Sequence, residues 1–251
     1  MIPTAYNRPE YLPLAYSSIA GQVTDSEIEI LVGCPANKID EVRAALPAGS
    51  KVVAEDERPG LALKLNELLM QLAPETDFLA WLGDDDILLP GAFETAAKAL
   101  SENPELSMVF GGCDYIDAEG KVLFTNQSGA FAHKILSFGP QLIPQPGSLM
   151  RSKHFIATGG LSNRFALAFD FDLFIKLKKQ GPMEFVPKTL SQFRWHPNSL
   201  SVKRRMRSAL EASRVRRANY RGLARVAWVL WEPVVILATW FAGKLVSLRT
   251  R

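Results

Sequence analysis

Short apolar runs alternate with amphipathic stretches along the first part of the chain. Four runs are mostly apolar and short enough to be buried strands, at 28–32, 51–54, 78–82 and 108–111. Between them, apolar positions recur every three or four residues, which predicts helices over 9–20, 61–72 and 91–100. This alternation predicts an α/β domain with a mostly parallel sheet flanked by helices. Because ligands of such sheets bind beyond the carboxyl ends of the strands, the loops that follow the strands are the places to look for chemistry.

The pattern becomes irregular further along the chain. Proline and glycine are dense over 139–147, which predicts a long loop, and another element follows at 148–156. An amphipathic helix is predicted over 171–179 and a short strand over 184–186.

The composition is that of an ordinary globular protein. Hydrophobic residues make up 47% of the 251 residues and charged residues 22%, which excludes global disorder and a fibrous repeat. Two cysteines, Cys34 and Cys113, cannot form a zinc site alone and do not suggest a disulfide scaffold. The chain opens without a basic-then-apolar leader, so we expect no cleaved signal peptide and a reducing, cytoplasmic location.

The charge is divided unevenly along the chain. The net charge is +3, but residues 203–251 contain 12 Lys and Arg and only two Glu, which gives +10 there and −7 for the remainder. The composition changes abruptly after Ser201. We therefore expect an α/β domain over 1–201 and a helical tail over 202–251 that favours an anionic partner.

Three consecutive aspartates follow the apolar run at 78–82. Residues 81–90 read WLGDDDILLP, and adjacent carboxylates repel one another unless a cation or several N–H donors compensate. Oxygen ligands at this density suit Mg²⁺ or Mn²⁺, which bind one or two protein carboxylates together with waters and substrate phosphates. The alternative is that Asp86 caps the following helix while Asp84 and Asp85 are solvated turn residues.

Five segments resemble, in the same order, the motifs of one enzyme family. They are IPTAYNRPEYL (2–12), GLALKLNELL (60–69), GDDDILLPGA (83–92), the segment from SLMRSKHF to FIKL (148–177) and FRWHPNSLS (193–201). Over 1–201 the chain thus resembles the family 2 glycosyltransferases of the GT-A fold, of the type that builds bacterial cell-surface polysaccharides and lipid-linked glycans. The resemblance implies a GT-A (Rossmann-like) α/β fold and transfer of a sugar from a nucleotide-sugar donor with inversion.

The resemblance implies a donor and metal site built from the first and third motifs. The residues that it places against the nucleobase are Pro3, Thr4, Tyr6 and Arg8, with Lys64 or Asn66 as a further contact. In the acidic turn it implies Asp84 at the ribose or the metal, Asp85 as a direct ligand of Mn²⁺ or Mg²⁺, and Asp86 as a further ligand or a helix cap. Such an ion would act as a Lewis acid and template for the diphosphate leaving group.

The last two motifs imply the acceptor side and a closing loop. Asp170 would be the base that takes the proton of the acceptor hydroxyl. Asp172 would lie on the acceptor side, or serve only as a carboxylate favoured at a helix N-terminus. Arg194 and His196 would close over the diphosphate, although a single loop histidine is as often plain surface. Arg151 would approach the diphosphate or the acceptor.

Several positions depart from the family pattern. The first strand is almost absent, Ala5 separates Thr4 from Tyr6, and the second strand ends LVGCPAN, where the family usually offers an aspartate. Phe169 stands where the family often has Glu. These departures favour the alternative function, a membrane-associated nucleotide- or nucleotide-sugar-binding protein of the same fold without turnover.

The tail joins a basic stripe to an apolar run. On a helix, one face would carry Lys203, Arg207, Arg214, Arg217, Arg221 and Arg225. The run 226–246 would measure about 31 Å as a straight helix against a hydrocarbon core of about 30 Å, but Glu232 and Pro233 interrupt it. We therefore expect 203–246 to lie on an anionic membrane surface. The alternatives are a helix packed on the body and, much less favoured, a nucleic-acid contact.

Together these observations predict a metal-dependent inverting glycosyltransferase that moves a hexosyl or related sugar from a nucleotide sugar to a lipid-linked or polysaccharide acceptor. We expect it to be cytoplasmic and peripheral or monotopic on the inner face of the cell membrane.

Overall fold

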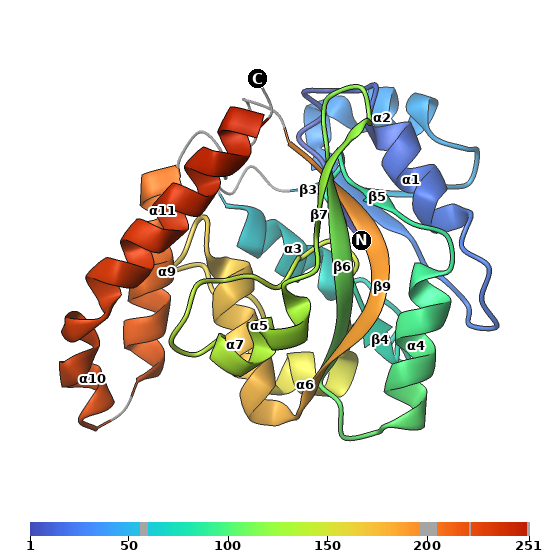
Figure 1. The fold of residues 1–251 in the computed structure, drawn as a ribbon. Helices are drawn as coiled ribbons and strands as arrows, with labels where there is room; N and C mark the ends of the chain where they lie inside the picture. Colours follow the sequence, from blue (N-terminus) through green and yellow to red (C-terminus); the bar gives the residue numbers. More distant parts are fainter. Residues whose placement is uncertain (56–59, 196–204, 221, 250–251) are drawn as a thin grey trace.

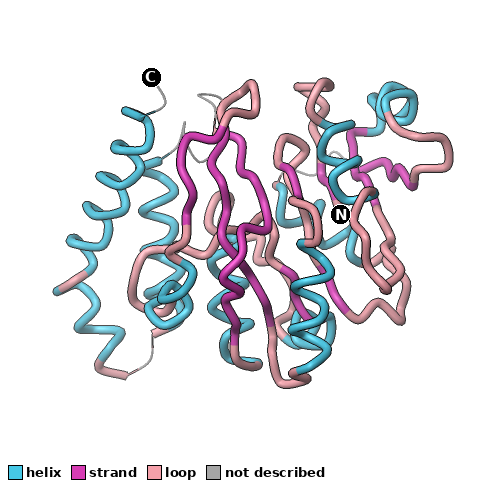
Figure 2. The backbone as a smooth tube through the Cα atoms, turned by 45° about the vertical axis from the view of Figure 1, so that its right-hand side comes forward, coloured by secondary structure: helices cyan, strands magenta, loops and turns pink. Residues whose placement is uncertain are grey.

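Two sheets and the helices on both of their faces make up the fold (Figures 1 and 2). The computed structural model describes residues 1–55, 60–195, 205–220 and 222–249. His196, the expected boundary at Ser201, and Lys203 and Arg221 of the expected stripe lie outside the described residues.

The first sheet is short and parallel. Its strands, in the order β1-β2-β3, are β1 (Ile2–Pro3), β2 (Leu31–Pro35) and β3 (Lys51–Glu55). Next to β1, the Met1 nitrogen donates to the Ala80 carbonyl at 2.9 Å, and the Leu82 N–H donates to the Met1 carbonyl at 2.9 Å. The segment that leads into the three aspartates therefore runs beside β1 and joins the two sheets.

The second sheet mixes parallel and antiparallel pairs. In the order β4-β8-β6-β9-β5, with β7 on β6, its strands are β4 (Phe78–Leu79), β8 (Leu149–Arg151), β6 (Met108–Ile116), β9 (Met183–Arg194), β5 (Ile87–Leu88) and β7 (Val122–Asn126). Only the β6–β9 pair is parallel among the pairs described. The α/β class is confirmed, but the expectation of a mostly parallel sheet holds only for β1–β3. A tight turn makes β6 and β7 an antiparallel hairpin, and the long 139–147 loop returns the chain antiparallel to β6.

Helices cover the sheets on both sides. They are α1 (Leu12–Ala20), α2 (Ile39–Ala45), α3 (Leu61–Leu69), α4 (Ala92–Glu102), α5 (Gly129–Ile135), α6 (Ser152–Ala157), α7 (Phe169–Gln180), α9 (Arg205–Asn219), α10 (Ala224–Ala227) and α11 (Glu232–Arg249), with 3₁₀ turns η1 (Ala36–Lys38) and η2 (Trp228–Leu230). One apolar cluster joins α1, α2 and α4 to the sheets. A second apolar cluster joins the sheets to α3, α7 and α9. These clusters fill the space between the sheets and the helices with apolar side chains.

Most predicted elements are present, with different ends. The strand expected over 51–54 and the helix over 61–72 correspond to β3 and α3. The strand expected over 184–186 is only the start of β9, which continues to Arg194 and so carries the chain up to the acidic turn. Polar residues occur throughout β9, so its apolar residues alone predict a much shorter strand.

The described part of the tail is helical, and its first helix packs into the core with α3 and α7. Ala209, Ala212 and Val215 of α9 are buried, and the last two belong to the cluster that contains α3 and α7. In Figure 1, α11 lies outside α9, on the side away from the sheets. No helix in the described part of the chain combines the length and apolarity needed to cross a bilayer.

Candidate functional site

The three aspartates form a turn at the carboxyl end of the segment that starts with β4. Asp86 donates its N–H to the Gly83 carbonyl at 3.2 Å, and β5 begins at the next residue. A Cβ on Gly83 would lie 2.8 Å from Asp86 Oδ2 and 3.0 Å from Asp85 Oδ1. The turn can gather these carboxylates because a glycine precedes them.

Asp84 and Asp85 are held by the loop after β1. Thr4 Oγ1 donates to Asp84 Oδ2 at 2.5 Å, and the Tyr6 N–H donates to Thr4 Oγ1 at 2.9 Å. Arg8 Nη1 lies 2.7 Å from Asp85 Oδ2, and its Nη2 lies 3.9 Å from Asp84 Oδ1. Burial raises the pKa of Asp84, and the Thr4 hydrogen bond opposes that rise.

The predicted donor residues at the start of the chain thus lie at the acidic turn. Tyr6 has a φ of 53°, which is unusual for a residue with a side chain and marks a tight local bend. The bend brings Thr4 and Arg8 to the same pair of carboxylates. Pro3 belongs to β1 and pairs with Gly33, one residue before Thr4.

Asp86 differs from its two neighbours because it is buried. It is only 4% exposed, and its Oδ1 accepts the Arg194 N–H at 3.0 Å. Burial and the neighbouring Asp85 raise its pKa well above the ordinary value. The expectation that Asp86 is a metal ligand is therefore not supported: its carboxylate fixes the turn to the end of β9.

Arg194 is part of the site but not as expected. Its side chain donates to three backbone carbonyls, those of Asp85 at 2.9 Å, Asp117 at 3.0 Å and Ala118 at 2.9 Å. The residue is 3% exposed, and its guanidinium lies over the Tyr11 ring at 4.4 Å. A buried guanidinium committed to carbonyls braces the turn and does not present itself to a diphosphate, so that expectation is corrected.

Asp170 lies in the first turn of α7. Its Oδ1 accepts the Phe171 N–H at 2.8 Å, and its Oδ2 lies 3.4 Å from Gln141 Nε2. Burial raises the pKa of Asp170 to about 6. A carboxyl with this pKa is ionised near neutral pH but readily accepts a proton, which suits a general base.

The 139–147 loop connects Asp170 to the segment before the acidic turn. Gln141 contacts Asp170, and Gln145 Nε2 donates to the Trp81 carbonyl at 2.7 Å. The Trp81 and Phe169 rings are also in contact, with centroids 6.4 Å apart. Trp81 lies three residues before Asp84, and Phe169 directly precedes Asp170, so the two acidic centres belong to the same region.

Sequence reasoning did not find the two glutamines of this loop. Gln141 and Gln145 stand four residues apart in the segment GPQLIPQPG. The only signal is that long amide side chains interrupt a proline- and glycine-rich loop, and such residues supply hydrogen bonds where backbone is irregular.

Arg151 and Asp172 are both paired with other groups of the protein. Arg151 Nε donates to Leu106 O at 3.0 Å, and its Nη2 donates to Leu100 O at 2.5 Å, at the C-terminal end of α4. Because β4 and β8 are antiparallel and Phe78 pairs with Arg151, Arg151 lies at the opposite end of β4 from the aspartates. Asp172 is 1% exposed and paired with Lys176 at 2.7 Å. The acceptor-side roles expected of Arg151 and Asp172 stay predictions.

Asn66 also has a structural role. Its Nδ2 donates to the Leu161 carbonyl at 2.8 Å, and its Oδ1 accepts the Leu161 N–H at 3.0 Å. Both functional groups of the amide therefore tie α3 to the segment after α6. A donor contact by Asn66 is not supported.

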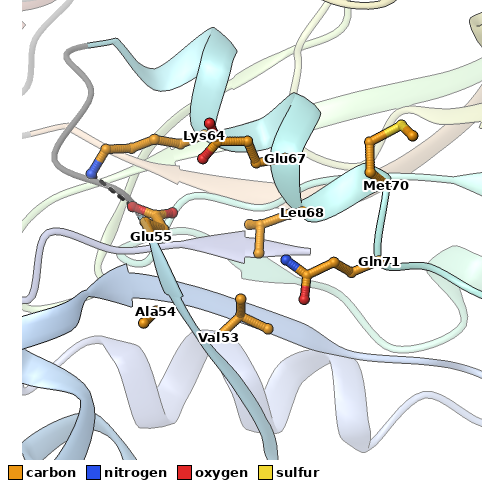
Figure 3. Close-up of a pocket in the computed structure, with 8 residues that line it drawn as sticks. All are labelled: Val53, Ala54, Glu55, Lys64, Glu67, Leu68, Met70 and Gln71. Carbon is orange, nitrogen blue, oxygen red and sulfur yellow. Dashed lines mark ion pairs between the residues drawn. The ribbon is translucent and has the colours of Figure 1, made fainter.

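Lys64 lines a cavity of about 430 Å³ between β3 and α3 (Figure 3). Its Nζ lies 2.7 Å from Glu55 Oε2, and Glu55 is 5% exposed, with Oε1 unpartnered among the described residues. Burial raises the pKa of Glu55. A Cβ on Gly33 would lie 2.4 Å from that oxygen, so β2 needs glycine there. Sequence reasoning missed Glu55, which ends the apolar run of β3.

Asp84 and Asp85 are the residues of the turn that fit a divalent cation. Their side chains are 16% and 15% exposed. In the described residues, no group of three or more His, Cys, Asp and Glu side chains is arranged to hold a metal. Mg²⁺ and Mn²⁺ need only one or two protein carboxylates when water and substrate phosphates supply the other ligands. The pair therefore fits such an ion, provided that Arg8 releases Asp85.

Comparison with known proteins agrees with this architecture. The model of the family "Glycosyl transferase family 2" matches residues 2–159. An uncharacterized glycosyltransferase of Rickettsia conorii is 28% identical over 213 residues, which cover 81% of this chain and 35% of that protein. Another, of Haemophilus influenzae, is 22% identical over 199 residues, which cover 76% of this chain and 65% of that one. The chain thus spans about a third of the Rickettsia protein.

Two solved structures share the fold. S. aureus TarS 1–349 in complex with UDP gives a TM-score of 0.58 at 15% identity, covering 88% of this chain and 65% of that one. The mannosyltransferase PcManGT from Pyrobaculum calidifontis, in complex with GDP-Man and Mn²⁺, gives a TM-score of 0.63 at 16% identity. The match covers 96% of this chain and 72% of that one. The family match covers more than half of the chain, and the fold agrees with it: the chain belongs to glycosyl transferase family 2 and has the GT-A fold.

Proposed function

We propose that this chain transfers a sugar, with inversion, from a nucleotide-sugar donor to a lipid-linked or polysaccharide acceptor. The observation that carries the proposal is the joint placement of two acidic centres. Asp84 and Asp85 lie in a turn at the carboxyl end of a strand, and the 139–147 loop ties Asp170 to the segment that enters this turn. This end of the sheet is where α/β proteins bind ligands.

The donor would bind along the loop after β1. Arg8 contacts the two partly exposed aspartates, and the buried Thr4 holds Asp84, so a nucleotide that enters here meets guanidinium and carboxylate groups. Mn²⁺ or Mg²⁺ held by Asp85, with help from Asp84, would neutralise the diphosphate as the glycosidic bond breaks. Solved structures of the same fold that hold UDP, or GDP-Man and Mn²⁺, support this assignment.

Asp170 would act as the base on the acceptor side. Its carboxylate takes the proton of the acceptor hydroxyl while the hydroxyl oxygen attacks the anomeric carbon. The bond to the diphosphate oxygen breaks on the opposite face, and the electron pair leaves with the diphosphate. Gln141 and the Phe171 N–H orient the carboxylate through its two oxygens. A single displacement of this kind inverts the anomeric centre.

The acceptor would reach the site from a membrane surface. Leu223, Val226 and Leu230 at α10 and η2 are 87%, 75% and 79% exposed, and Arg217 and Arg225 beside them are also exposed. An exposed apolar face with flanking cations matches an anionic lipid surface. We place the protein as a peripheral or monotopic protein at the inner face of the cell membrane, where lipid-linked sugars are presented.

The proposal is tested by transfer of radiolabelled sugar to membrane acceptors in the presence of Mn²⁺. We compare the wild type with Asp85→Ala and Asp170→Asn, and use Glu102→Gln on the exposed face of α4 as the matched control, because its side chain is 67% exposed. Transfer should fall at least a hundredfold in the two site variants and stay unchanged in the control.

Two results would contradict the proposal. Full transfer in Asp85→Ala or Asp170→Asn would remove that residue from its role. If calorimetry detected nucleotide binding while neither transfer nor hydrolysis of any donor occurred, the alternative of a nucleotide-binding protein without turnover would hold. Such a protein would keep the ion pair between Arg8 and Asp85 that the structure shows.

A further inference from the structure

Arg216 of α9 and Glu232 of α11 form an ion pair that is buried in the protein. The two residues are each 1% exposed, and Arg216 Nε lies 3.1 Å from both Glu232 carboxylate oxygens, with Nη2 donating to Oε1 as well. Removing two charges from water is costly, and such a pair is retained without penalty only when further groups satisfy it. The remaining contacts of Arg216 are therefore informative.

Those contacts lead to the surroundings of Asp170. Arg216 Nη1 donates to the Gly139 carbonyl at 3.0 Å, at the start of the loop that carries Gln141. The guanidinium also lies over the ring of Phe171, with 5.7 Å from Cζ to the ring centroid. Phe171 follows Asp170 directly and donates its N–H to that carboxylate. One buried guanidinium thus contacts both segments that hold the Asp170 side chain.

A second contact from α9 reaches Leu167, two residues before the start of α7. Glu211 Oε2 accepts the Leu167 N–H at 2.7 Å, and Arg207 Nε lies 3.2 Å from Glu211 Oε1. The α9 helix therefore fixes the chain before Asp170 through Glu211 and after it through Arg216. The exposed basic residues of α9 on the other side, Arg214 and Arg217, make no such contact with this region in the described structure.

We propose that Arg216, oriented by Glu232, is a positioning residue for Asp170. Apolar packing of Ala212 and Val215 already attaches α9 to the rest of the protein. Such packing does not fix the orientation of neighbouring polar groups, whereas a guanidinium that is hydrogen-bonded on two sides does. The inference rests on the proposed role of Asp170 as base. It assigns to the helical tail a part in the transfer reaction in addition to any lipid contact.

The test is a double-mutant cycle on purified full-length protein. Arg216→Met should lower kcat for transfer by roughly ten- to hundredfold, because a displacement of about 1 Å at a reacting group has an effect of that size. The KM for the donor and its affinity by calorimetry should change less than twofold. In the Asp170→Asn background, Arg216→Met should lower the residual activity no further, because the group that it positions is gone.

Lys98→Met on α4, which also removes an exposed positive charge from a side chain that is 68% exposed, is the matched control and should leave kcat unchanged. If Arg216→Met does not fold, Glu232→Gln replaces it, because the amide keeps the shape and one acceptor; it should lower kcat in the wild type and not in Asp170→Asn. Equal losses in the two backgrounds, or an unchanged kcat with only a lower melting temperature, would overturn the inference. Undiminished transfer in Asp170→Asn would instead overturn the proposed function.

Discussion

The three aspartates of the acidic turn have three different environments. Asp84 accepts a hydrogen bond from Thr4, Asp85 pairs with Arg8, and Asp86 is buried against the Arg194 N–H. Only the first two retain exposed carboxylate surface. The three consecutive aspartates therefore have two kinds of role: Asp84 and Asp85 are available to ligands, and Asp86 stabilises the turn.

Asp86 should affect stability more than chemistry. Asp86→Ala leaves the Arg194 N–H unsatisfied in a buried position, so the free energy of unfolding should fall by roughly 1–3 kcal/mol in urea titrations. Asp86→Asn keeps an acceptor without the charge and should change that free energy little. Equal losses in the two variants would contradict the role assigned to this carboxylate.

Asp170 should impose an acidic limit on the pH profile. Burial raises its pKa to about 6, so below this pH the carboxyl is protonated and cannot accept the proton of an acceptor. We expect kcat to fall about tenfold per pH unit below 6 and to be flat above it. A profile that is flat down to pH 4.5, measured with the Glu102→Gln control alongside, would exclude Asp170 as the base.

The same pKa predicts a gain in stability when the charge is removed. The folded state favours the protonated form, so ionisation between pH 3.8, the ordinary value, and about 6 lowers stability. Asp170→Asn should therefore raise the melting temperature above pH 6, and this advantage should vanish below pH 4. A variant that loses transfer while gaining stability is typical of a functional residue.

At the residue scale, the sequence predicts which types of side chain the site contains better than it predicts the partners that each side chain binds. Thr4, Arg8, Asp84 and Asp85 do gather at one site. Arg151, Asn66 and Arg194 have suitable chemistry, but each is committed to backbone groups. Nothing local distinguishes a guanidinium that binds a ligand from one that binds carbonyls, because the partner carbonyls come from distant segments.

At the scale of elements, antiparallel pairing decides which residues reach the site. Arg151 belongs to the acceptor-side segment 148–177, yet the β4–β8 register carries it to the far end of β4. The alternating strand and helix pattern correctly predicts the α/β class and elements such as β3 and α3. It does not predict the two-residue strand β5, or β7 and the length of β9, whose half-polar sequences are stabilised by pairing with β6.

Arg151 should behave as a structural residue. Arg151→Met removes donors from the carbonyls of Leu100, Asn103 and Leu106, so the free energy of unfolding should fall by roughly 1–3 kcal/mol. Transfer per folded molecule should stay unchanged. Lys153→Met, at an exposed position of α6, is the control and should alter neither quantity. Loss of transfer with normal stability would restore Arg151 to the acceptor side.

At the scale of the whole molecule, the tail has two distinct parts. The α9 helix packs into the core with α7, whereas α10, η2 and α11 expose a row of apolar side chains. The change of composition after Ser201 predicts a separate tail, and that boundary stays a prediction. It does not reveal the attachment of α9, because Glu211 and Arg216 read as two more charges in a highly charged helix.

The exposed apolar side chains predict lipid binding. Leu230→Ser should weaken the partition onto vesicles that contain phosphatidylglycerol roughly ten- to hundredfold, because burying a leucine contributes about 1.5–3 kcal/mol. Leu14→Ser on α1, where Leu14 is 51% exposed, is the control and should have no effect. Equal binding by all three proteins, or binding that does not depend on anionic lipid, would contradict the proposed membrane surface.

The attachment of α9 has a practical consequence for anyone who shortens this chain. A fragment that stops before α9 would leave the Leu167 amide and the Gly139 carbonyl without their partners and would uncover apolar surface of α7. Such a fragment would keep every residue of the family match, which ends at residue 159, yet lack the contacts that hold the segments around Asp170. Inactivity of a trimmed protein would then reflect lost scaffolding and would say nothing about the chemistry of the intact one.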